Sequence, residues 1–236
     1  MNTERVIIKG KPTSTDYENL QREVMWDEAL FKTNLAGIDN NSIVELCKNF
    51  RGKTSGQSKS NRGGWQLDLE RWDNEAVAEL FDRIEAVCTQ LFAERFGIPR
   101  ETRINRAWLN VNEKHHYNSA HTHPGAVFSG VYYVKADGLE EQGVLSFIRG
   151  DQVPIMTVPE SAGSHNADPI WRAYNKQVMN TGDLFLFPPW LLHEVHRNET
   201  DSERIVIAFN VQFHNHLNQS VQEGFDGPWR VEVPIP

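Results

Sequence analysis

Cysteine is scarce in this chain, because Cys47 and Cys88 are the only two among 236 residues. Both lie inside apolar helical patterns, where a buried free thiol is expected rather than a disulfide or a metal ligand. The sequence also lacks an uncharged apolar run long enough to span a bilayer, and residues 1–11 contain no apolar core of signal-peptide length. We therefore expect a cytoplasmic protein without a membrane partner.

Basic residues are also fewer than acidic ones, with 24 lysines and arginines against 32 aspartates and glutamates. The net charge is therefore -8 and the pI is near 5.6. No cluster of basic residues interleaved with aromatic ones is available to track a phosphate backbone. These features argue against a nucleic-acid partner. They leave the substrate open between a small molecule and a protein or peptide, and they leave a homodimer open.

The composition is that of a folded globular protein, with 39% hydrophobic and 24% charged residues. The length suits one well-buried domain, and we expect residues 1–236 to form it.

The clearest helical pattern covers residues 74–96. Its apolar residues repeat with a period of 3.6, Asp73 is the expected N-cap, and Gly97 and Pro99 end it. A shorter helix is expected over residues 42–50. The polar loop 51–64 that follows is either a surface connection or a loop that orders over a ligand, and we favour the surface connection.

Beyond Ile104 the pattern changes to short β-branched and aromatic runs at residues 104–111, 126–134, 143–148, 182–187 and 204–213. Short strands without intervening helices indicate an antiparallel sandwich or barrel, with the preceding helices packed on its outer face. Residues 151–180 carry few strand signals, and we expect an elaborated loop near the barrel mouth or a disordered insertion.

The last of these strands has two different faces, because bulky apolar residues alternate with smaller or more polar ones. The bulky residues are Ile205, Ile207, Phe209, Val211 and Phe213, and the others are Arg204, Val206, Ala208, Asn210 and Gln212. We expect the bulky face to contact the helices. The other face, which starts with an arginine, is expected to line a cavity that holds an anion.

Six of the nine histidines lie in two short stretches of the sequence, residues 115–123 and 193–196. His121 and His123 form an H-x-H pair, and on extended chain their imidazoles project to the same side. His193 follows an apolar strand and a proline stop, so it can face the pair across a barrel. Two imidazoles and one further ligand on one face leave adjacent positions open, as non-haem iron(II) requires for a chelating co-substrate and oxygen.

Several motifs resemble those of a 2-oxoglutarate/Fe(II) oxygenase family found among bacterial and phage proteins. They are A-W-L-N at 107–110, H-T-H-P at 121–124, S-G-V-Y-Y-V at 129–134, G-D-L at 182–184, F-P-P-W at 187–190, His193 and R-I-V-I-A-F-N at 204–210. N-R-G-G-W at 61–65 also looks like a motif from the N-terminal part of that family. More distantly, the sequence is similar to prolyl hydroxylases.

The resemblance implies a double-stranded β-helix, jelly-roll or cupin-like, formed by residues 101–215. Residues 1–100 would then form a helical and mixed support region packed on one sheet, and residues 216–236 a C-terminal extension. The implied activity is that of a dioxygenase that uses Fe(II) and 2-oxoglutarate to hydroxylate a substrate, with release of succinate and CO2.

The resemblance also implies roles for single residues. His121 and His193 would bind the metal, Arg204 would pair with the distal carboxylate of 2-oxoglutarate, and Tyr133 would donate to the same carboxylate. Ser129 shares strand parity with Tyr133 and can also point into the barrel. Arginine suits its role because its planar fork pairs with a carboxylate in bidentate fashion.

His123 departs from the prolyl hydroxylase pattern, which has an acidic residue at this position. Either His123 is the third metal ligand, which we favour, or it lies behind the ligands and water or a distant carboxylate completes the set. Five other histidines are expected to face solvent or to form local hydrogen bonds, namely His115, His116, His196, His214 and His216.

Two other functions fit parts of this pattern. One is a cupin-like three-histidine dioxygenase that does not use 2-oxoglutarate, and Arg204 and Tyr133 argue against it. The other is a non-catalytic β-barrel binding module, because a fold alone does not guarantee catalysis.

Overall fold

The computed structural model describes residues 30–98, 100–149 and 174–214. Its helices are α2 (Asn40–Arg51) and α3 (Glu75–Phe96), with short 3-10 turns at Arg71–Asp73 and Glu140–Gln142. Its strands are β1 (Phe31–Asn34), β2 (Asn61–Arg62), β3 (Trp65–Asp68), β4 (Thr102–Asn112), β5 (Tyr117–His121), β6 (Phe128–Lys135), β7 (Leu145–Ile148), β8 (Tyr174–Gln177), β9 (Asp183–Phe187), β10 (His193–Val195) and β11 (Arg204–Phe213).

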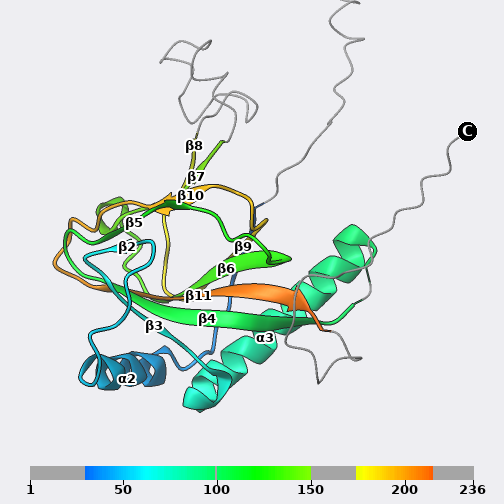
Figure 1. Cartoon of the computed structure of the whole chain (residues 1–236), viewed down its shortest axis with the longest axis horizontal. Coiled ribbons are helices and arrows are strands. Elements are labelled where there is room, and N and C mark those ends of the chain that lie inside the picture. The colour runs from blue at the N-terminus through cyan, green and yellow to red at the C-terminus, as the bar shows by residue number, and fades with distance from the viewer. Residues whose placement is uncertain (1–29, 99, 150–173, 215–236) are drawn as a thin grey trace, which may run out of the picture.

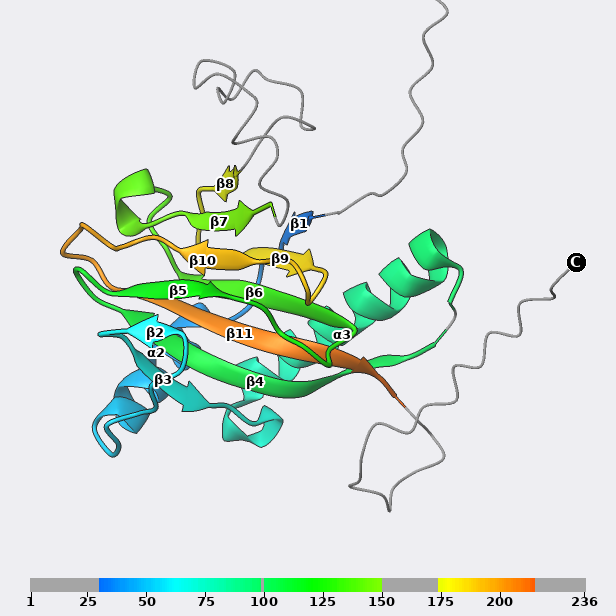
Figure 2. The same cartoon turned by 45° about the horizontal axis from the view of Figure 1, so that its top comes forward.

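The strands form two antiparallel sheets that lie one above the other (Figure 1, Figure 2). The larger sheet has the order β1-β9-β6-β11-β4-β3, and the smaller has the order β2-β5-β10-β7-β8. This is the double-stranded β-helix expected from the sequence. Strands β1, β2 and β3 come from the N-terminal part of the chain and complete edges of both sheets.

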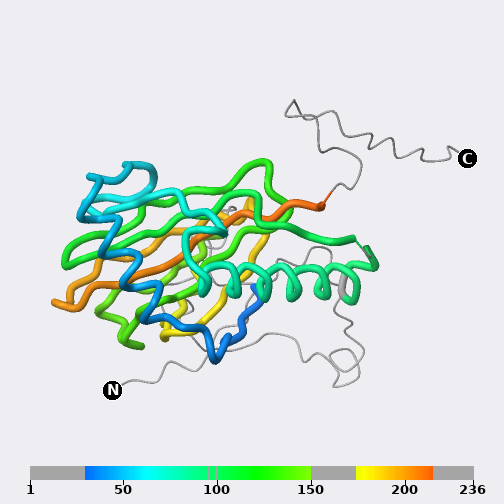
Figure 3. Tube along the Cα trace, turned by 90° about the horizontal axis from the view of Figure 1, so that it is seen from below, coloured from blue at the N-terminus to red at the C-terminus, as the bar shows by residue number. Residues whose placement is uncertain are grey.

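Both helices pack on the outer face of the larger sheet, and α3 crosses it as the teal coil in Figure 3. Their apolar stripes meet the bulky face of β11, where Ile205, Ile207, Phe209 and Val211 are buried in one core with residues of α2 and α3. Burial of a large apolar side chain contributes about 1.5–3 kcal/mol. The expected division of β11 into a helix-facing side and a cavity side is confirmed.

Helix α3 begins one residue later than expected. Asn74 is its N-cap, with its side chain accepting from the Ala76 backbone N–H at 2.7 Å, whereas Asp73 ends the preceding 3-10 turn. The Asp73 carboxylate instead accepts from the backbone N–H of Glu70 at 2.7 Å. The prediction of Asp73 as the cap was wrong because two adjacent residues could serve and the preceding turn uses one of them.

Residues 174–177 also differ from expectation, because they form β8 rather than part of a loop. Their backbone pairs with β7 from Tyr174↔Ile148 to Gln177↔Leu145. The side chains are mostly exposed, so backbone pairing rather than an apolar pattern defines this edge strand. Residues 150–173 and 216–236, for which a loop and an extension were expected, lie outside the described residues.

Cys47 and Cys88 are free and buried, as expected. Burial raises the pKa of Cys47 to about 11 and that of Cys88 to about 12, so both thiols stay protonated at neutral pH. In the described part of the chain, no helix is long and apolar enough to cross a membrane.

Candidate metal and co-substrate site

Three histidines meet between the two sheets. His121 ends β5, His193 begins β10 directly opposite it in the strand register, and His123 lies two residues beyond β5. One ring nitrogen from each lies within 4.8 Å of the others, and the Nε2 atoms of His123 and His193 are 3.3 Å apart. The structure therefore brings together all three histidines expected to bind metal.

Backbone carbonyls orient two of these rings. The Nδ1 atom of His121 lies 2.8 Å from the carbonyl oxygen of Ser119, and Nδ1 of His193 lies 2.9 Å from that of Leu191. Because a carbonyl only accepts, each Nδ1 carries the proton and donates it. In both rings the Nε2 lone pair is left free for a metal ion, as is usual for histidine ligands.

All three rings stay neutral at physiological pH. Burial lowers the pKa of His123 to about 3, with help from the neighbouring His193 and His121, and lowers that of His193 to about 4. Burial also lowers the pKa of His121. A neutral imidazole is the form that binds a cation, so the cluster is prepared for metal.

Arg204 occupies the other end of the space between the sheets. It is the first residue of β11 and is 2% exposed, and its Nη1 donates to the carbonyl oxygens of Gln142 and Gly143, the latter at 3.0 Å. Gly143 has a φ of 89°, and a Cβ there would clash with the backbone carbonyl oxygen of His196 and lie 2.8 Å from Arg204 Nη1, so glycine is required beside the guanidinium.

The second terminal nitrogen of Arg204, Nη2, is buried and has no partner among the described residues. Burial lowers the pKa of Arg204, because removal from water disfavours its charged form. Arginine nevertheless keeps its charge in proteins, and a buried cation with a free donor is costly unless an anion joins it. This end of the site is therefore built to bind an anion.

Tyr133, on β6, is buried and lies beside Arg204 in the same pocket. Burial raises the pKa of its hydroxyl above the usual value, and the charge of Arg204 opposes that shift. The phenol is therefore protonated and can donate. Ser129 lies on the same strand, but its hydroxyl donates to Asn210 Oδ1 at 2.9 Å and it does not line the pocket.

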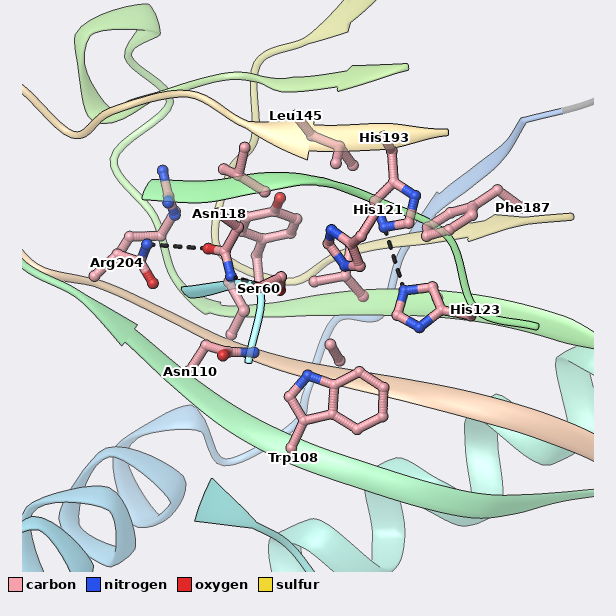
Figure 4. Close-up of a pocket in the computed structure, with 17 residues that line it drawn as sticks. Ser60, Trp108, Asn110, Asn118, His121, His123, Leu145, Phe187, His193 and Arg204 are labelled. Atoms are coloured by element: carbon pink, nitrogen blue, oxygen red, sulfur yellow. Dashed lines mark hydrogen bonds between the residues drawn. The ribbon is translucent and has the colours of Figure 1, made fainter. Parts of the chain in front are cut away.

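One pocket joins the histidines to Arg204. Trp108 and Asn110 of β4 form its floor, and Figure 4 shows the histidines at one end and Arg204 at the other. The ring centroids of Trp108 and His123 are 5.7 Å apart. Asn110 is 4% exposed, and its Oδ1 has no partner among the described residues.

Ser60 and Asn118 also line the pocket, and sequence reasoning missed both. The loop 51–64 was expected to be a surface connection, yet its Ser60 reaches the pocket. The adjacent motif at residues 61–65 was the signal that could have drawn attention to it. The other described histidines lie outside the pocket, and His115, for example, is exposed and contacts Glu199 at 3.1 Å.

Residues 106–210 match the family model described as "Putative 2OG-Fe(II) oxygenase". No curated protein matches the chain. A solved prolyl-4-hydroxylase from Pseudomonas putida is 12% identical, with 80% of this chain and 94% of that chain covered and a TM-score of 0.58.

Two other solved structures are similar. SnoK, a non-heme alpha ketoglutarate dependent carbocyclase from nogalamycin biosynthesis, is 14% identical, covering 86% of this chain and 87% of that chain with a TM-score of 0.56. HygX from Streptomyces hygroscopicus, solved with nickel and 2-oxoglutarate bound, is 14% identical, covering 78% and 82% with a TM-score of 0.51. At these identities the likeness shows a shared fold.

Proposed function

We propose that this chain, whose residues 106–210 match the 2OG-Fe(II) oxygenase family, is an Fe(II)- and 2-oxoglutarate-dependent oxygenase. It would use O2 to hydroxylate its substrate, with one oxygen atom entering the substrate and the other entering the succinate that forms, with CO2, from 2-oxoglutarate. The observation that carries the proposal is a single pocket with two different ends: neutral imidazoles at one end and a buried arginine with an unpaired Nη2 at the other.

His121, His123 and His193 are the metal ligands in this proposal. The donor set fits a divalent ion, because nitrogen atoms 3.3 Å apart can both bond to one ion at about 2.0–2.1 Å, the usual zinc–histidine distance. Imidazole suits iron as well as zinc. When bound, Fe(II) supplies the oxidising chemistry, while the protein positions the reactants and keeps water away.

Arg204 and Tyr133 are the co-substrate residues. The free Nη2 of Arg204 can pair with a carboxylate, and the protonated hydroxyl of Tyr133 can donate to the same group. For Ser129 to contact the co-substrate as well, its hydroxyl has to exchange its present hydrogen bond to Asn210. A dicarboxylate that reaches from the histidines to Arg204 satisfies both ends of the pocket.

The same observations weigh against the alternatives. A three-histidine dioxygenase that does not use 2-oxoglutarate has no need of a buried arginine with a free donor. A non-catalytic binding module has no need of three neutral imidazoles turned toward one point.

The test is anaerobic addition of Fe(II) and then 2-oxoglutarate to the purified chain, with the visible absorption spectrum as the readout. We expect iron to bind and 2-oxoglutarate to produce a weak charge-transfer band. His193→Ala should lose both iron and band, because removal of one of three ligands destroys the site. The exposed His115→Ala is the matched control and should keep both.

Each contrary result has a meaning. Iron binding without any effect of 2-oxoglutarate would favour the three-histidine dioxygenase. Absence of iron binding by the unmodified chain would favour the binding module.

A further inference from the structure

Ser60 is the only residue lining the described pocket that lies outside the segment matched by the family model. It belongs to the loop 57–64, which follows α2, includes the two residues of β2 and leads into β3. Through Ser60, the N-terminal region therefore lines part of a pocket whose other residues lie between positions 108 and 208.

The loop is held in one conformation by Asn61, which is 3% exposed. Its Oδ1 accepts from the backbone N–H of Lys59 at 2.6 Å, and its Nδ2 donates to the carbonyl oxygens of Gln57 and Gly64 at 3.0 and 2.5 Å. The carbonyl oxygen of Ser60 accepts from the backbone N–H and the hydroxyl of Ser119 at 3.0 and 3.1 Å. Ser60 is thus fixed from both sides.

A chain of side-chain hydrogen bonds sets the direction of the Ser60 hydroxyl. Asn112 Nδ2 donates to Asn118 Oδ1 at 3.1 Å, and Asn118 Nδ2 donates to Ser60 Oγ at 3.3 Å. Because Ser60 Oγ accepts from Asn118, its own proton is available to a different acceptor. None of the described residues accepts this proton. In the view of Figure 4, Ser60 lies between Arg204 and the histidines.

We propose that the Ser60 hydroxyl donates to a carboxylate oxygen of 2-oxoglutarate, so that the loop 57–64 completes the co-substrate site. Asn112, at the start of the chain of hydrogen bonds, is the cross-strand neighbour of Arg204, so the chain that ends at Ser60 begins beside Arg204. Asn118 acts through Ser60 as a positioning residue. This inference rests on the proposed function.

The experiment measures 2-oxoglutarate affinity by anaerobic calorimetric titration of the Fe(II)-loaded chain. Ser60→Ala should weaken 2-oxoglutarate binding by about 10-fold or more, as for the loss of a hydrogen bond to a charged group. Ser60→Thr keeps the hydroxyl and should retain most of the affinity. Iron affinity should not change in either variant, because the Ser60 carbonyl that holds Ser119 remains.

Ser58→Ala is the matched control, because Ser58 lies on the same loop, is exposed and does not line the pocket. It should bind 2-oxoglutarate like the unmodified chain. Unchanged affinity in Ser60→Ala, with the unmodified chain binding 2-oxoglutarate, overturns this inference and leaves the proposed function standing. Failure of the unmodified chain to bind 2-oxoglutarate overturns the proposed function itself.

Discussion

Arg204 is the side chain on which the choice of co-substrate depends. Arg204→Ala should weaken 2-oxoglutarate binding while iron binding stays intact, since the guanidinium lies at the end of the pocket away from the histidines. Loss of a charge-assisted hydrogen bond costs about 1.5–3 kcal/mol, which is roughly a 10- to 150-fold loss of affinity. Anaerobic calorimetry on the Fe(II)-loaded protein measures it.

Arg197→Ala provides the control, because Arg197 is largely exposed and does not line the pocket. Its 2-oxoglutarate affinity should match that of the unmodified chain. An Arg204→Ala protein with the same affinity as the control would exclude Arg204 as the carboxylate partner.

His123 is where this sequence differs from the prolyl hydroxylase pattern, and three proteins measured side by side decide its role. As a metal ligand, His123→Ala should bind iron far more weakly, whereas His123→Asp should keep iron through its carboxylate. Aspartate also lowers the charge of the site from plus two to plus one, so dianionic 2-oxoglutarate should bind less tightly to that variant.

The alternative role gives a different pattern of iron affinities. If His123 only supports the ligands, alanine should cost about 10- to 100-fold in metal affinity, and aspartate should give no rescue. Iron affinity equal to that of the unmodified chain in His123→Ala would remove the residue from the site.

The sequence could predict that these residues lie in one pocket, because each belongs to a short motif whose spacing carries chemical meaning. His121 and His123 are two positions apart on extended chain, and Arg204 opens an alternating strand. Ser60 could not be predicted in this way. Its place in the pocket depends on Asn61 and Ser119, and such contacts between distant segments leave no periodic pattern in the sequence.

Helix α3 offers a test of its corrected start. Asn74→Ala should lower the free energy of unfolding by about 1–2 kcal/mol, because it removes the N-cap. It also removes the bond from Asn74 Nδ2 to Ser42 Oγ at 2.9 Å, which ties α3 to α2. Asp73→Ala should cost less, since Asp73 serves only an exposed 3-10 turn. Urea unfolding of both variants measures the difference, and a larger cost at Asp73 would contradict the assignment.

Long or strongly patterned elements could be predicted from the sequence, and short edge strands could not. The expected run 204–213 coincides with β11, whose two faces differ in polarity. By contrast, β10 has three residues and β2 has two, which is too short for alternation to be visible. Pairing with neighbouring strands defines them. The pairing of β10 with β5 places His193 opposite His121, and the pairing of β2 with β5 places Asn61, next to Ser60, opposite Asn118.

The folded chain as a whole should become more stable when metal binds, because the proposed ligands join β5, β10 and the residues beyond β5. At a free Fe(II) concentration 100 times the dissociation constant, the gain is about 2.7 kcal/mol. In a chain of this size, each kcal/mol of added stability raises the melting temperature by about 2–4 °C. Anaerobic thermal unfolding with and without Fe(II) measures it, and a rise of the same size in His193→Ala would show that the stabilising ion binds elsewhere.

The three N-terminal strands have a consequence for any shortened form of this chain. β1 pairs with β9, β2 with β5 and β3 with β4, so residues before Glu101 cover one edge of the smaller sheet and both edges of the larger one. A fragment starting at Glu101 would present bare backbone donors and acceptors along those edges, beside an apolar face stripped of its helices. Such edges recruit strands from other molecules. A fragment starting at Glu101 should therefore self-associate into aggregates instead of folding as a smaller version of the protein.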